Sequence, residues 1–455
     1  MSFFTYNPAT GEKIKEYHEL STAQINGKLI KAEKAHQSWK KTTFTERSKL
    51  MLKAAEVLKN KKNDYARLMS EEMGKPFKQG IAEAEKCGWV CEYYAENAER
   101  FLADMNIKTE ASKSYAAFNP LGPVLAIMPW NFPFWQVFRF AAPALMAGNA
   151  GLLKHSRNTM QCAIEIENVF LEAGFPEGLF SNLVIGSGPV ADIIKDPIIK
   201  GVTLTGSTPV GKKVAAEAGA NLKKTVLELG GSDPYIVLND ADVELAAEAC
   251  VTGRLINSGQ SCIAAKRFIV EKGILEEFTS AFVEKMKAKR MGAPMEEGID
   301  IGPQARGDLR DDLHRQVKQS IEKGADLLLG GEVPDMPGYY YPATVLANVQ
   351  KGMPAYDEET FGPVAAIIPA ENEADAIEKA NDSIFGLGGA VFSRDTEKAE
   401  RMAREEIITG TCAVNDFVRS DPRLPFGGVK ESGYGRELSE FGIREFVNIK
   451  TVYLK

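Results

Sequence analysis

The chain has 455 residues, of which 44% are hydrophobic and 26% are charged, a composition typical of soluble globular proteins. A chain of this length is too long to fold around one hydrophobic core, so we expect two large domains and a small extra element. The net charge of −7 is mixed in sign along the chain and includes no Lys/Arg-rich run, which disfavours nucleic acid as a partner. The N-terminus lacks an apolar signal region and no window approaches 18 consecutive apolar residues, so the sequence predicts a cytoplasmic protein without a membrane span.

Cysteine and histidine are sparse. The six cysteines include no CxxC pair, and in a long chain without a signal peptide they are expected to be reduced thiols. The four histidines are scattered, without an HExxH motif or a His/Cys cluster, so no catalytic metal is expected.

The first hundred residues predict helices, and a β/α alternation begins near residue 114. Good helix formers with apolar residues at helical spacing occupy 46–62 and 81–101. Short apolar runs then predict buried strands at 124–128, 150–154, 183–185 and 201–205, and helices over 160–173, from 189 and up to 218. Because strand, turn and helix alternate in this way in a parallel, doubly wound sheet, the expected fold class is α/β.

A second β/α series is predicted between residues 235 and 415. Its strands are expected at 267–270, 364–368 and 389–392, and its helices at 275–289, 310–323 and 373–380. Apolar and polar residues alternate over 446–454, which predicts an edge strand that seeks a partner, on this subunit or another.

Cys262 follows the flexible, polar stretch Ser258-Gly259-Gln260-Ser261, a context that exposes a side chain. A cysteine nucleophile attacks a carbonyl as the thiolate, so a helix N-terminus or a similar local field is expected to lower its pKa. An inert, buried thiol is an equally open alternative, because a lone cysteine is weak evidence.

A carboxylate and an amide are the other candidate catalytic groups. Glu228 lies between the apolar stretch 225–227 and a Gly-Gly pair, where burial would raise its pKa toward that of a useful base; a salt-bridged glutamate at a strand end is the alternative. Asn131 is bracketed by Pro129 and Pro133, and on so stiff a loop its NH2 can donate to a developing oxyanion; an ordinary turn asparagine is the alternative.

Two glycine turns are candidate phosphate sites. The stretch 186–191 reads GxGxxA after a predicted strand, and 206–211 opens a helix after the next strand. Each would place backbone N–H groups and the positive end of a helix beside an anion. Either turn alone is weak, but two in succession favour a dinucleotide site.

Six motifs follow one another along the chain. They are Pro129-Trp130-Asn131-Phe132-Pro133, Thr205-Gly206-Ser207-Thr208, Glu228-Leu229-Gly230-Gly231, Gly259-Gln260-Ser261-Cys262, Glu359-Thr360-Phe361-Gly362-Pro363 and Pro425-Phe426-Gly427-Gly428. In this order and spacing they resemble the motifs of the aldehyde dehydrogenase superfamily, over essentially the whole chain. The resemblance implies a Rossmann-like dinucleotide-binding domain (1–101 and 121–228), an α/β catalytic domain (229–425) and a small β oligomerisation element (102–120 and 426–455). The alternating segment 446–454 suggests strand pairing between subunits, so we expect a homodimer or a homotetramer.

By matching position, the resemblance also implies roles for single residues. Cys262 would be the nucleophile, Asn131 and the Cys262 backbone N–H would hold the oxyanion, and Glu228 would activate the hydrolytic water. The cofactor-binding residues would be Trp130, Lys154, Gly188, Gly206, Ser207, Glu359 and Phe361. The implied reaction oxidises an aldehyde through a cysteine thiohemiacetal, hydride transfer to the nicotinamide and hydrolysis of the resulting thioester.

One departure from the family pattern concerns the cofactor. Many NAD-preferring relatives carry a glutamate three residues after the lysine that matches Lys154, where it binds the adenosine ribose. Here that position is Arg157, preceded by Ser156. A carboxylate would repel a 2′-phosphate, whereas arginine and serine would not, so NADP or NAD is expected, with NADP slightly favoured. A solvent-facing Arg157 is the alternative.

The expected substrate depends on one arginine and a loop. Arg139, eight residues after Asn131, resembles the arginine with which succinate semialdehyde dehydrogenases hold the distal carboxylate. Arg419, Ser420 and Arg423 are candidate second anchors, while the second arginine of some of those enzymes is Ile256 here. The chain thus resembles a bacterial subgroup that oxidises succinic semialdehyde to succinate. A salt-bridge role for Arg139 on a helix surface is the alternative.

Other functions stay open at this point. A dehydrogenase for another short-chain or acidic semialdehyde, or for aliphatic aldehydes broadly, would use the same three catalytic residues. A catalytically silent scaffold of the same fold, or a thiol esterase without a cofactor, belongs to a different class. Ala264 stands two residues after Cys262, where some relatives carry the partner of a disulfide switch.

Overall fold

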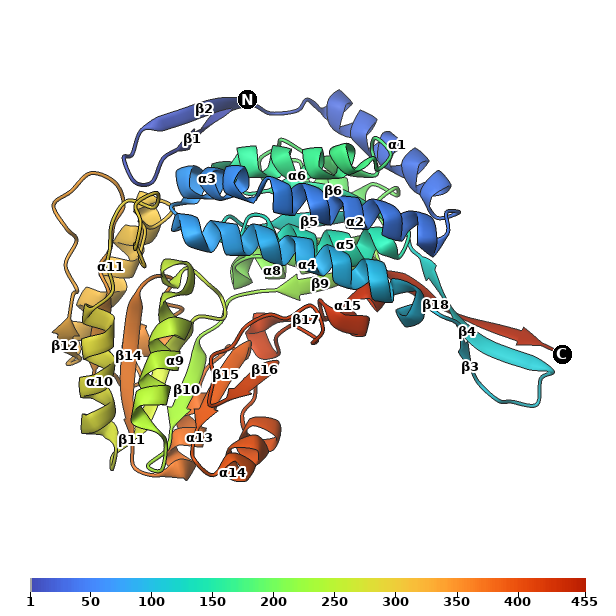
Figure 1. Ribbon diagram of the computed structural model, residues 1–455. Helices are drawn as coiled ribbons and strands as arrows, with labels where there is room; N and C mark the ends of the chain where they lie inside the picture. Colours follow the sequence, from blue (N-terminus) through green and yellow to red (C-terminus); the bar gives the residue numbers. More distant parts are fainter. Residues whose placement is uncertain (1) are drawn as a thin grey trace.

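The structure is a computed structural model that describes residues 2–455, and a six-stranded sheet forms the centre of one of its two large units (Figure 1). In spatial order its strands are β17 (Gly433–Tyr434), β9 (Lys224–Glu228), β8 (Gly201–Thr205), β5 (Pro123–Met128), β6 (Ala150–His155) and β7 (Phe180–Asn182). All neighbours run parallel except β17 and β9. Every residue of β5 and β8 is buried, because helices cover both faces of the sheet.

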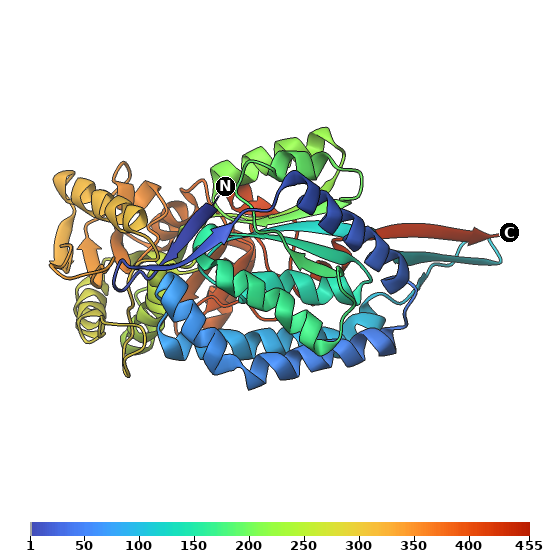
Figure 2. The same ribbon diagram turned by 90° about the horizontal axis from the view of Figure 1, so that it is seen from above.

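The helices around this sheet form layers (Figure 2). One face carries α5 (Trp135–Met146) and α6 (Met160–Ala173), and the other carries α1 (Thr22–Trp39) and α8 (Thr208–Ala220), with α7 (Val190–Lys195) against α8. An outer layer on α5 and α6 consists of α2 (Phe44–Asn60), α3 (Lys62–Met73) and α4 (Phe77–Phe101). Capping boxes fix the starts of α1 and α2, with Ser21 and Gln24 in the first and Thr43 and Glu46 in the second.

The order in which the chain adds strands to this sheet reverses between β5 and β8. From β5 the chain continues to β6 and β7 on one side, and it then crosses to β8 and β9 on the other side. In a doubly wound sheet, the loops at the carboxyl ends of two such strands diverge and leave a crevice for a ligand. Here these loops begin at Pro129 and Gly206.

A seven-stranded sheet forms the centre of the second unit. Its order is β12 (Asp326–Leu329), β13 (Thr344–Ala347), β14 (Val364–Ala370), β11 (Ala265–Glu271), β10 (Asp233–Val237), β15 (Gly388–Phe392) and β16 (Thr411–Val414), and only β12 and β13 pair antiparallel. One face packs on α9 (Val243–Leu255) and α10 (Leu275–Lys287). The other face packs on α11 (Gly307–Glu322), α12 (Pro354–Asp357), α13 (Glu373–Asn381) and α14 (Thr396–Arg401).

A three-stranded antiparallel arm projects from the body, with the C-terminus at its tip (Figure 1). It consists of β18 (Val447–Leu454), β4 (Lys113–Pro120) and β3 (Met105–Asn106), and β18 pairs with β4 along its whole length. The predicted edge strand is therefore present, and one of its sides is paired within the chain. The tail before it contains α15 (Ser439–Arg444), which packs on α4 and α5. At the other end of the chain, β1 (Ser2–Tyr6) and β2 (Lys13–His18) form a separate hairpin.

The α/β fold class is confirmed, but several predicted segments differ from the structure. The apolar run 183–185 is a loop and not a strand, because β7 ends at Asn182. The Leu183 N–H still donates to the Leu153 carbonyl of β6, but the Val184 carbonyl accepts from the Leu20 N–H, which lies outside the sheet. Two helices, α4 and α11, begin earlier than predicted, since a glycine in the first turn of each weakens the helical pattern. Within the tail 426–455, β17 joins the first sheet, so only part of that tail belongs to the arm.

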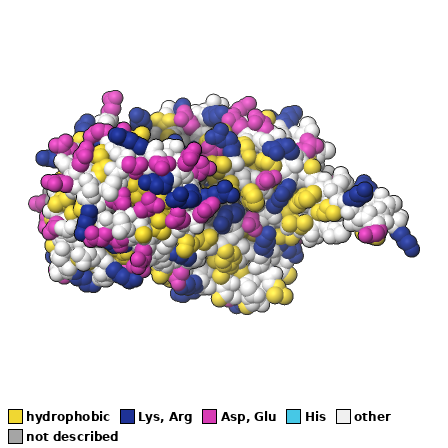
Figure 3. Space-filling model, turned by 90° about the horizontal axis from the view of Figure 1, so that it is seen from below, with side chains coloured by type: hydrophobic (Ala, Val, Ile, Leu, Met, Phe, Trp, Pro, Cys, Tyr) yellow, Lys and Arg dark blue, Asp and Glu magenta, His cyan; other side chains and the backbone are white. Residues whose placement is uncertain are grey.

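The surface and the helices add two further facts. Acidic and basic side chains are interspersed on the face shown in Figure 3. Across residues 2–455, no helix is both long enough and apolar enough to cross a membrane. The same residues contain no group of three or more His, Cys, Asp or Glu side chains arranged to hold a metal ion.

Candidate active site

The predicted site residues meet where the two sheets face each other. At or just beyond the carboxyl ends of the first sheet lie Asn131, Lys154, Gly206 and Glu228. Just before the amino ends of the second sheet lie Cys262, Glu359 and Phe361. The two groups are in direct contact, because Asn131 Nδ2 donates to the Gln260 carbonyl at 3.0 Å. The fold therefore assembles one site from motifs that are far apart in the sequence.

The backbone that leads to Cys262 is strained. In the short turn η2 (Ile256–Gly259), Asn257 and Ser258 have left-handed φ angles of 53° and 57°. Such a conformation costs a residue with a Cβ ~1–3 kcal/mol and persists only where the surroundings enforce it. Here the Asn257 N–H donates to Gln79 Oε1 at 2.7 Å, and Ser258 Oγ accepts from the Gly302 N–H at 2.9 Å. These contacts fix the approach to the nucleophile.

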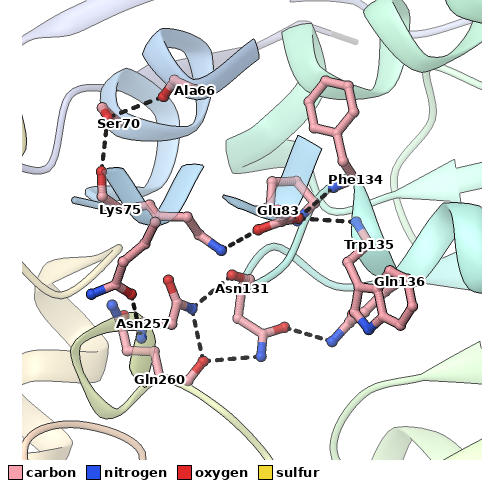
Figure 4. Close-up of polar contacts among 12 residues, drawn as sticks. Ala66, Ser70, Lys75, Glu83, Asn131, Phe134, Trp135, Gln136, Asn257 and Gln260 are labelled. Carbon is pink, nitrogen blue, oxygen red and sulfur yellow. Dashed lines mark hydrogen bonds and ion pairs between the residues drawn. The ribbon is translucent and has the colours of Figure 1, made fainter. Parts of the chain in front are cut away.

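Asn131 is buried, and hydrogen bonds on both sides orient its amide (Figure 4). Its Oδ1 accepts from Gln136 Nε2 at 3.1 Å, while its Nδ2 donates to the Gln260 carbonyl. The Asn131 carbonyl accepts from Asn257 Nδ2 at 2.7 Å. An amide nitrogen has two hydrogens, so one of them has no acceptor among the described residues and can donate to an oxyanion.

Glu83 holds the other end of the Asn131 loop (Figure 4). It is buried on α4, and its Oε1 accepts the N–H groups of Phe134 and Trp135, both at 3.0 Å. These groups lie at the start of α5, where a helix leaves backbone donors free and favours negative charge. Lys75, which is also buried, pairs with the second carboxylate oxygen. A buried ion pair therefore anchors the loop that carries the amide donor.

The Cys262 thiol is half-buried and unpaired, and its surroundings favour the protonated form. Burial raises its pKa to about 12, and the charges of Arg139 and Lys266 offset only part of this rise. The expectation of a lowered pKa is therefore wrong for this structure, because Cys262 follows the turn η2 and does not lie at a helix N-terminus. Lys266 Nζ donates to the Cys262 carbonyl at 2.7 Å. Nucleophilic attack requires a base that removes the thiol proton.

Glu228, the candidate base, is buried at the end of β9. Neither of its carboxylate oxygens has a hydrogen-bond partner among the described residues, so it is not the salt-bridged glutamate considered as the alternative. Burial raises its pKa well above the usual range, and the charge of Glu437 adds to the rise while that of Arg139 opposes it. Its Oε1 faces Gly427, where a Cβ would stand 2.9 Å away. Glu228 does not line the cavity beside Cys262, so its side chain has to turn to act on a group there.

The glycine pair after Glu228 allows two close approaches. A Cβ at Gly230 would stand 2.5 Å from Glu359 Oε2, and a Cβ at Gly231 would stand 2.6 Å from the Cys262 carbonyl. The Gly231 N–H donates to Glu359 Oε1 at 3.0 Å, and Lys266 Nζ lies 3.6 Å from the same oxygen. These two glycines therefore let Glu359 and the nucleophile loop pack against the chain.

Three predicted cofactor residues, Trp130, Lys154 and Ser207, lie at or just beyond the carboxyl ends of neighbouring strands of the first sheet. Trp130 and Phe361 come from opposite units and contact edge to face, with ring centroids 5.7 Å apart. Lys154 is half-buried at the end of β6, and its pKa is lowered by burial and by the charge of Arg157. Ser207 is the N-cap of α8, and its side chain makes no capping hydrogen bond. A cation and a helix start with a free hydroxyl are groups that bind phosphate, so these residues fit a dinucleotide.

The other predicted cofactor residues are partly engaged within the protein. Arg157 has 49% of its side chain exposed, pairs with Glu19 and lies 5.1 Å from the Phe3 ring centroid. Ser156 Oγ donates to Asn158 Oδ1 at 2.6 Å. Arg157 is thus held beside the β1–β2 hairpin and does not extend freely into solvent.

The two glycines predicted to bind the cofactor differ in availability. The Gly206 N–H donates to the Glu228 carbonyl at 3.0 Å, so this donor is already used. Gly188 is open, because no atom lies within 4 Å of the position of a Cβ.

A cavity of about 190 Å³ opens beside Cys262. This volume is below the ~300–1,000 Å³ common for drug-sized ligands, so the cavity suits a small substrate. Its polar lining consists of Gln79, Glu83, Lys86, Gln136, Ser261, Arg139, Arg419 and Ser420. Its apolar lining includes Phe132, Trp135, Ile256, Ile263 and Phe426. Three of the four predicted substrate residues therefore reach this cavity, and Arg423 does not line it.

Both predicted arginine anchors that line the cavity already have carboxylate partners. Arg139, in the second turn of α5, is buried, pairs with Glu437 and donates to Thr205 Oγ1 at 3.2 Å. It is not the helix-surface residue considered as the alternative, although it does form a salt bridge. Arg419 is 53% exposed and donates to both carboxylate oxygens of Asp416 at 2.6 Å.

Lys86 is a cavity residue that sequence reasoning missed. It is half-buried on α4, and its Nζ donates to Ser420 Oγ at 2.9 Å. One face of α4 presents the side chains of Gln79, Glu83 and Lys86, which follow one another at helical spacing. Polar residues at this spacing, on a helix that is otherwise packed against protein, are the sequence signal that could have indicated a polar site.

A Rossmann-like sheet joined to a second α/β unit, with cysteine, amide and carboxylate motifs at the junction, is the arrangement of the aldehyde dehydrogenases. A model of the aldehyde dehydrogenase family matches residues 2–452, and the chain belongs to this family. Curated relatives include a probable succinate-semialdehyde dehydrogenase [NADP(+)] of Synechocystis sp., 48% identical over 454 residues and 100% of both chains. The succinate-semialdehyde dehydrogenase [NADP(+)] 1 of Mycobacterium tuberculosis is 46% identical over 457 residues, again over 100% of both chains.

Solved structures agree with this assignment. The crystal structure of succinic semialdehyde dehydrogenase from Streptococcus pyogenes, in complex with NADP+ as the cofactor, superposes with a TM-score of 0.97. That protein is 37% identical to this chain, and the match covers 99% of each.

Proposed function

We propose that the chain is an NADP-dependent dehydrogenase that oxidises succinic semialdehyde to succinate. The observation that carries this proposal is the small cavity that contains Cys262 together with three cationic side chains, Lys86, Arg139 and Arg419. A thiol and positive charge in one small space suit a short aldehyde that bears a carboxylate. The names of the relatives from Synechocystis and Mycobacterium point to the same substrate and cofactor.

In the proposed mechanism, Cys262 forms the covalent intermediate. A base takes the thiol proton, Sγ bonds to the aldehyde carbon, and the carbonyl oxygen becomes an oxyanion. Asn131 Nδ2–H and the Cys262 backbone N–H stabilise that oxyanion. NADP, when bound, supplies the hydride acceptor that turns the thiohemiacetal into a thioester.

Glu228 acts in the hydrolytic half of the proposed mechanism. Its side chain turns from the Gly427 side and takes a proton from a water, whose oxygen attacks the thioester carbon. The C–S bond then breaks, which releases the carboxylate product and returns the sulfur of Cys262. The raised pKa of Glu228 suits a carboxylate that has to accept and pass on protons.

The proposed cofactor site follows the residues already described. Lys154, Ser156 and Arg157 would hold the 2′-phosphate end of NADP, and Glu359 with the Trp130–Phe361 pair would hold the nicotinamide end. Ser207, Gly188 and Gly206 would lie along the phosphates between them. The positive charge of Lys154 and Arg157 supports NADP over NAD.

The proposed assembly is a homodimer or a homotetramer. β18 is one of the two edge strands of the arm, and its Ile449 and Tyr453 side chains are 60% and 59% exposed, which supports pairing with a second subunit. In this proposal the arm residues, within 102–120 and 426–455, form the oligomerisation element. Residues 1–101 and 121–228 form the dinucleotide-binding domain, and 229–425 form the catalytic domain.

The test is reduction of NAD and NADP with a panel of succinic semialdehyde, glutaric semialdehyde, butyraldehyde and benzaldehyde, with Cys262→Ala as the control. We expect the highest kcat/KM with succinic semialdehyde and NADP, and no turnover in Cys262→Ala. Equal activity with butyraldehyde would contradict the proposed substrate while leaving the enzyme class in place.

A further inference from the structure

The cationic side chains of the cavity differ in whether their charge is already compensated. Arg139 pairs with Glu437, and Arg419 pairs with Asp416. Lys86 makes no ion pair with any described residue, although it lines the same cavity. An incoming anion therefore has to compete with an internal carboxylate at each arginine but not at Lys86.

Ser420, next to Lys86, has a hydroxyl proton without an acceptor in residues 2–455. Its Oγ accepts from Lys86 Nζ at 2.9 Å and from Trp135 Nε1 at 3.0 Å, which uses both lone pairs of the oxygen. Since Ser420 lines the cavity, the remaining proton can be donated to a ligand there. Lys86 has further N–H donors, and its Nζ also lies 4.2 Å from the Trp135 ring centroid.

We propose that Lys86 and Ser420 bind the distal carboxylate of the aldehyde substrate, and that Lys86 is the residue that selects an acidic aldehyde. This inference rests on the proposed function. A carboxylate is a pure acceptor, so one oxygen can take an N–H of Lys86 and the other the hydroxyl proton of Ser420. A neutral aldehyde of the same length would leave both donors unpaired, and the site would discriminate against it.

The charge of Lys86 also makes substrate choice depend on pH. Burial lowers the pKa of Lys86 to about 8, and the charge of Arg139 on α5 adds to the lowering. Glu83 and Cys87 on its own helix, and Asp421 from the loop after Ser420, act in the opposite direction. Lys86 is therefore charged below about pH 8 and neutral above it, and the affinity for an acidic aldehyde falls as pH rises through this value. A bound carboxylate favours the charged form of Lys86, so the loss of affinity occurs at a higher pH when the substrate is bound.

Steady-state kinetics of the holoenzyme with NADP, at about pH 7, test this role. Lys86→Met keeps an unbranched side chain over Trp135 and removes the charge. We expect it to lower the ratio of kcat/KM for succinic semialdehyde to that for butyraldehyde by about tenfold or more, mainly through KM. Lys86→Arg keeps the charge and should retain the preference at high pH. Lys78→Met, exposed on the same helix, is the matched control and should keep the wild-type ratio.

The outcomes separate this inference from the proposed function. If the wild type prefers succinic semialdehyde and Lys86→Met keeps the same ratio, the role of Lys86 is overturned while the proposed function stands. If the wild type shows no preference, both are overturned. Should Lys86→Met fail to fold, inhibition of wild-type butyraldehyde oxidation by succinate decides the matter. Inhibition that weakens above about pH 8 supports Lys86, and inhibition that is independent of pH overturns it.

Discussion

Gln79 and Glu83 lie one turn apart on α4, and each holds one of the two loops that meet at the nucleophile. Gln79 Oε1 accepts the Asn257 N–H at 2.7 Å, in the loop that leads to Cys262. Glu83 Oε1 accepts two N–H groups at 3.0 Å, at the end of the loop that carries Asn131. A single rigid helix therefore sets the distance between the amide donor and the thiol, and neither residue has to touch the substrate to affect the reaction.

Glu83→Gln should lower both stability and turnover. The glutamine side chain can accept only through one oxygen and leaves the buried Lys75 ammonium without its counter-charge. Removing one partner of a buried ion pair costs ~3–5 kcal/mol. Urea unfolding should show this loss, and kcat should fall because the single oxygen of glutamine cannot accept from both the two loop N–H groups and Lys75, which weakens the anchoring of the Asn131 loop.

A double variant separates the contribution of the Lys75–Glu83 ion pair from that of the Asn131 loop. Lys75→Met alone leaves a buried carboxylate, whereas Lys75→Met with Glu83→Gln removes both charges. We expect the double variant to be more stable than the sum of the two single losses predicts. Additive losses would show that Lys75 and Glu83 do not stabilise each other.

Asn131→Ala should reduce kcat much more than it changes KM. Loss of one oxyanion donor costs ~2.7–4 kcal/mol of transition-state stabilisation, or about 100–1,000-fold in kcat. Gln136→Leu is a useful comparison. It removes the donor that orients the Asn131 amide, so the amide can flip, and we expect a smaller loss of kcat than in Asn131→Ala. A large rise in KM with an unchanged kcat in Asn131→Ala would contradict the oxyanion role.

Much of the fold could be predicted from the sequence because the two sheets are mostly parallel and covered on both faces. Such strands are continuous apolar runs, and the runs at 124–128 and 201–205 indeed form β5 and β8. The same signal misled at 183–185, since an apolar run reports burial and not pairing. Local sequence therefore predicts which segments are buried in the core better than it predicts where the pairing of a strand with its neighbour ends.

Loop motifs in the sequence predicted which residues belong to the site. They could not predict chemical properties, such as a pKa, that depend on the residues packed around them. The polar approach to Cys262 indicates a reachable thiol, but its raised pKa comes from burial by segments that lie far from it in the sequence. Lys86 and Glu83 belong to a helix whose pattern shows that one face is buried, without showing what that face meets. Arg139 lines the cavity beside Cys262, yet its partner Glu437 lies about three hundred residues further on.

The thiol of Cys262 should react slowly with iodoacetamide at neutral pH in the enzyme without cofactor. With a pKa of about 12, the thiolate fraction rises roughly tenfold for each pH unit across the working range. The alkylation rate should therefore increase without a plateau between about pH 7 and 10. Cys262→Ala supplies the background from Cys412, which is also only half-buried. A plateau below about pH 8 would show an activated thiolate and contradict this prediction.

Arg157 and Glu19 should act on the cofactor in opposite directions. Arg157→Ala removes a charged hydrogen-bond donor, worth ~1.5–3 kcal/mol, so KM for NADP should rise about 10–100-fold while KM for NAD changes little. Glu19→Gln removes the carboxylate that now pairs with Arg157, and it should lower KM for NADP because the guanidinium no longer has to leave an internal partner. Both constants come from initial rates of NADPH and NADH formation with succinic semialdehyde. Equal changes for the two cofactors in Arg157→Ala would place Arg157 away from the 2′-phosphate.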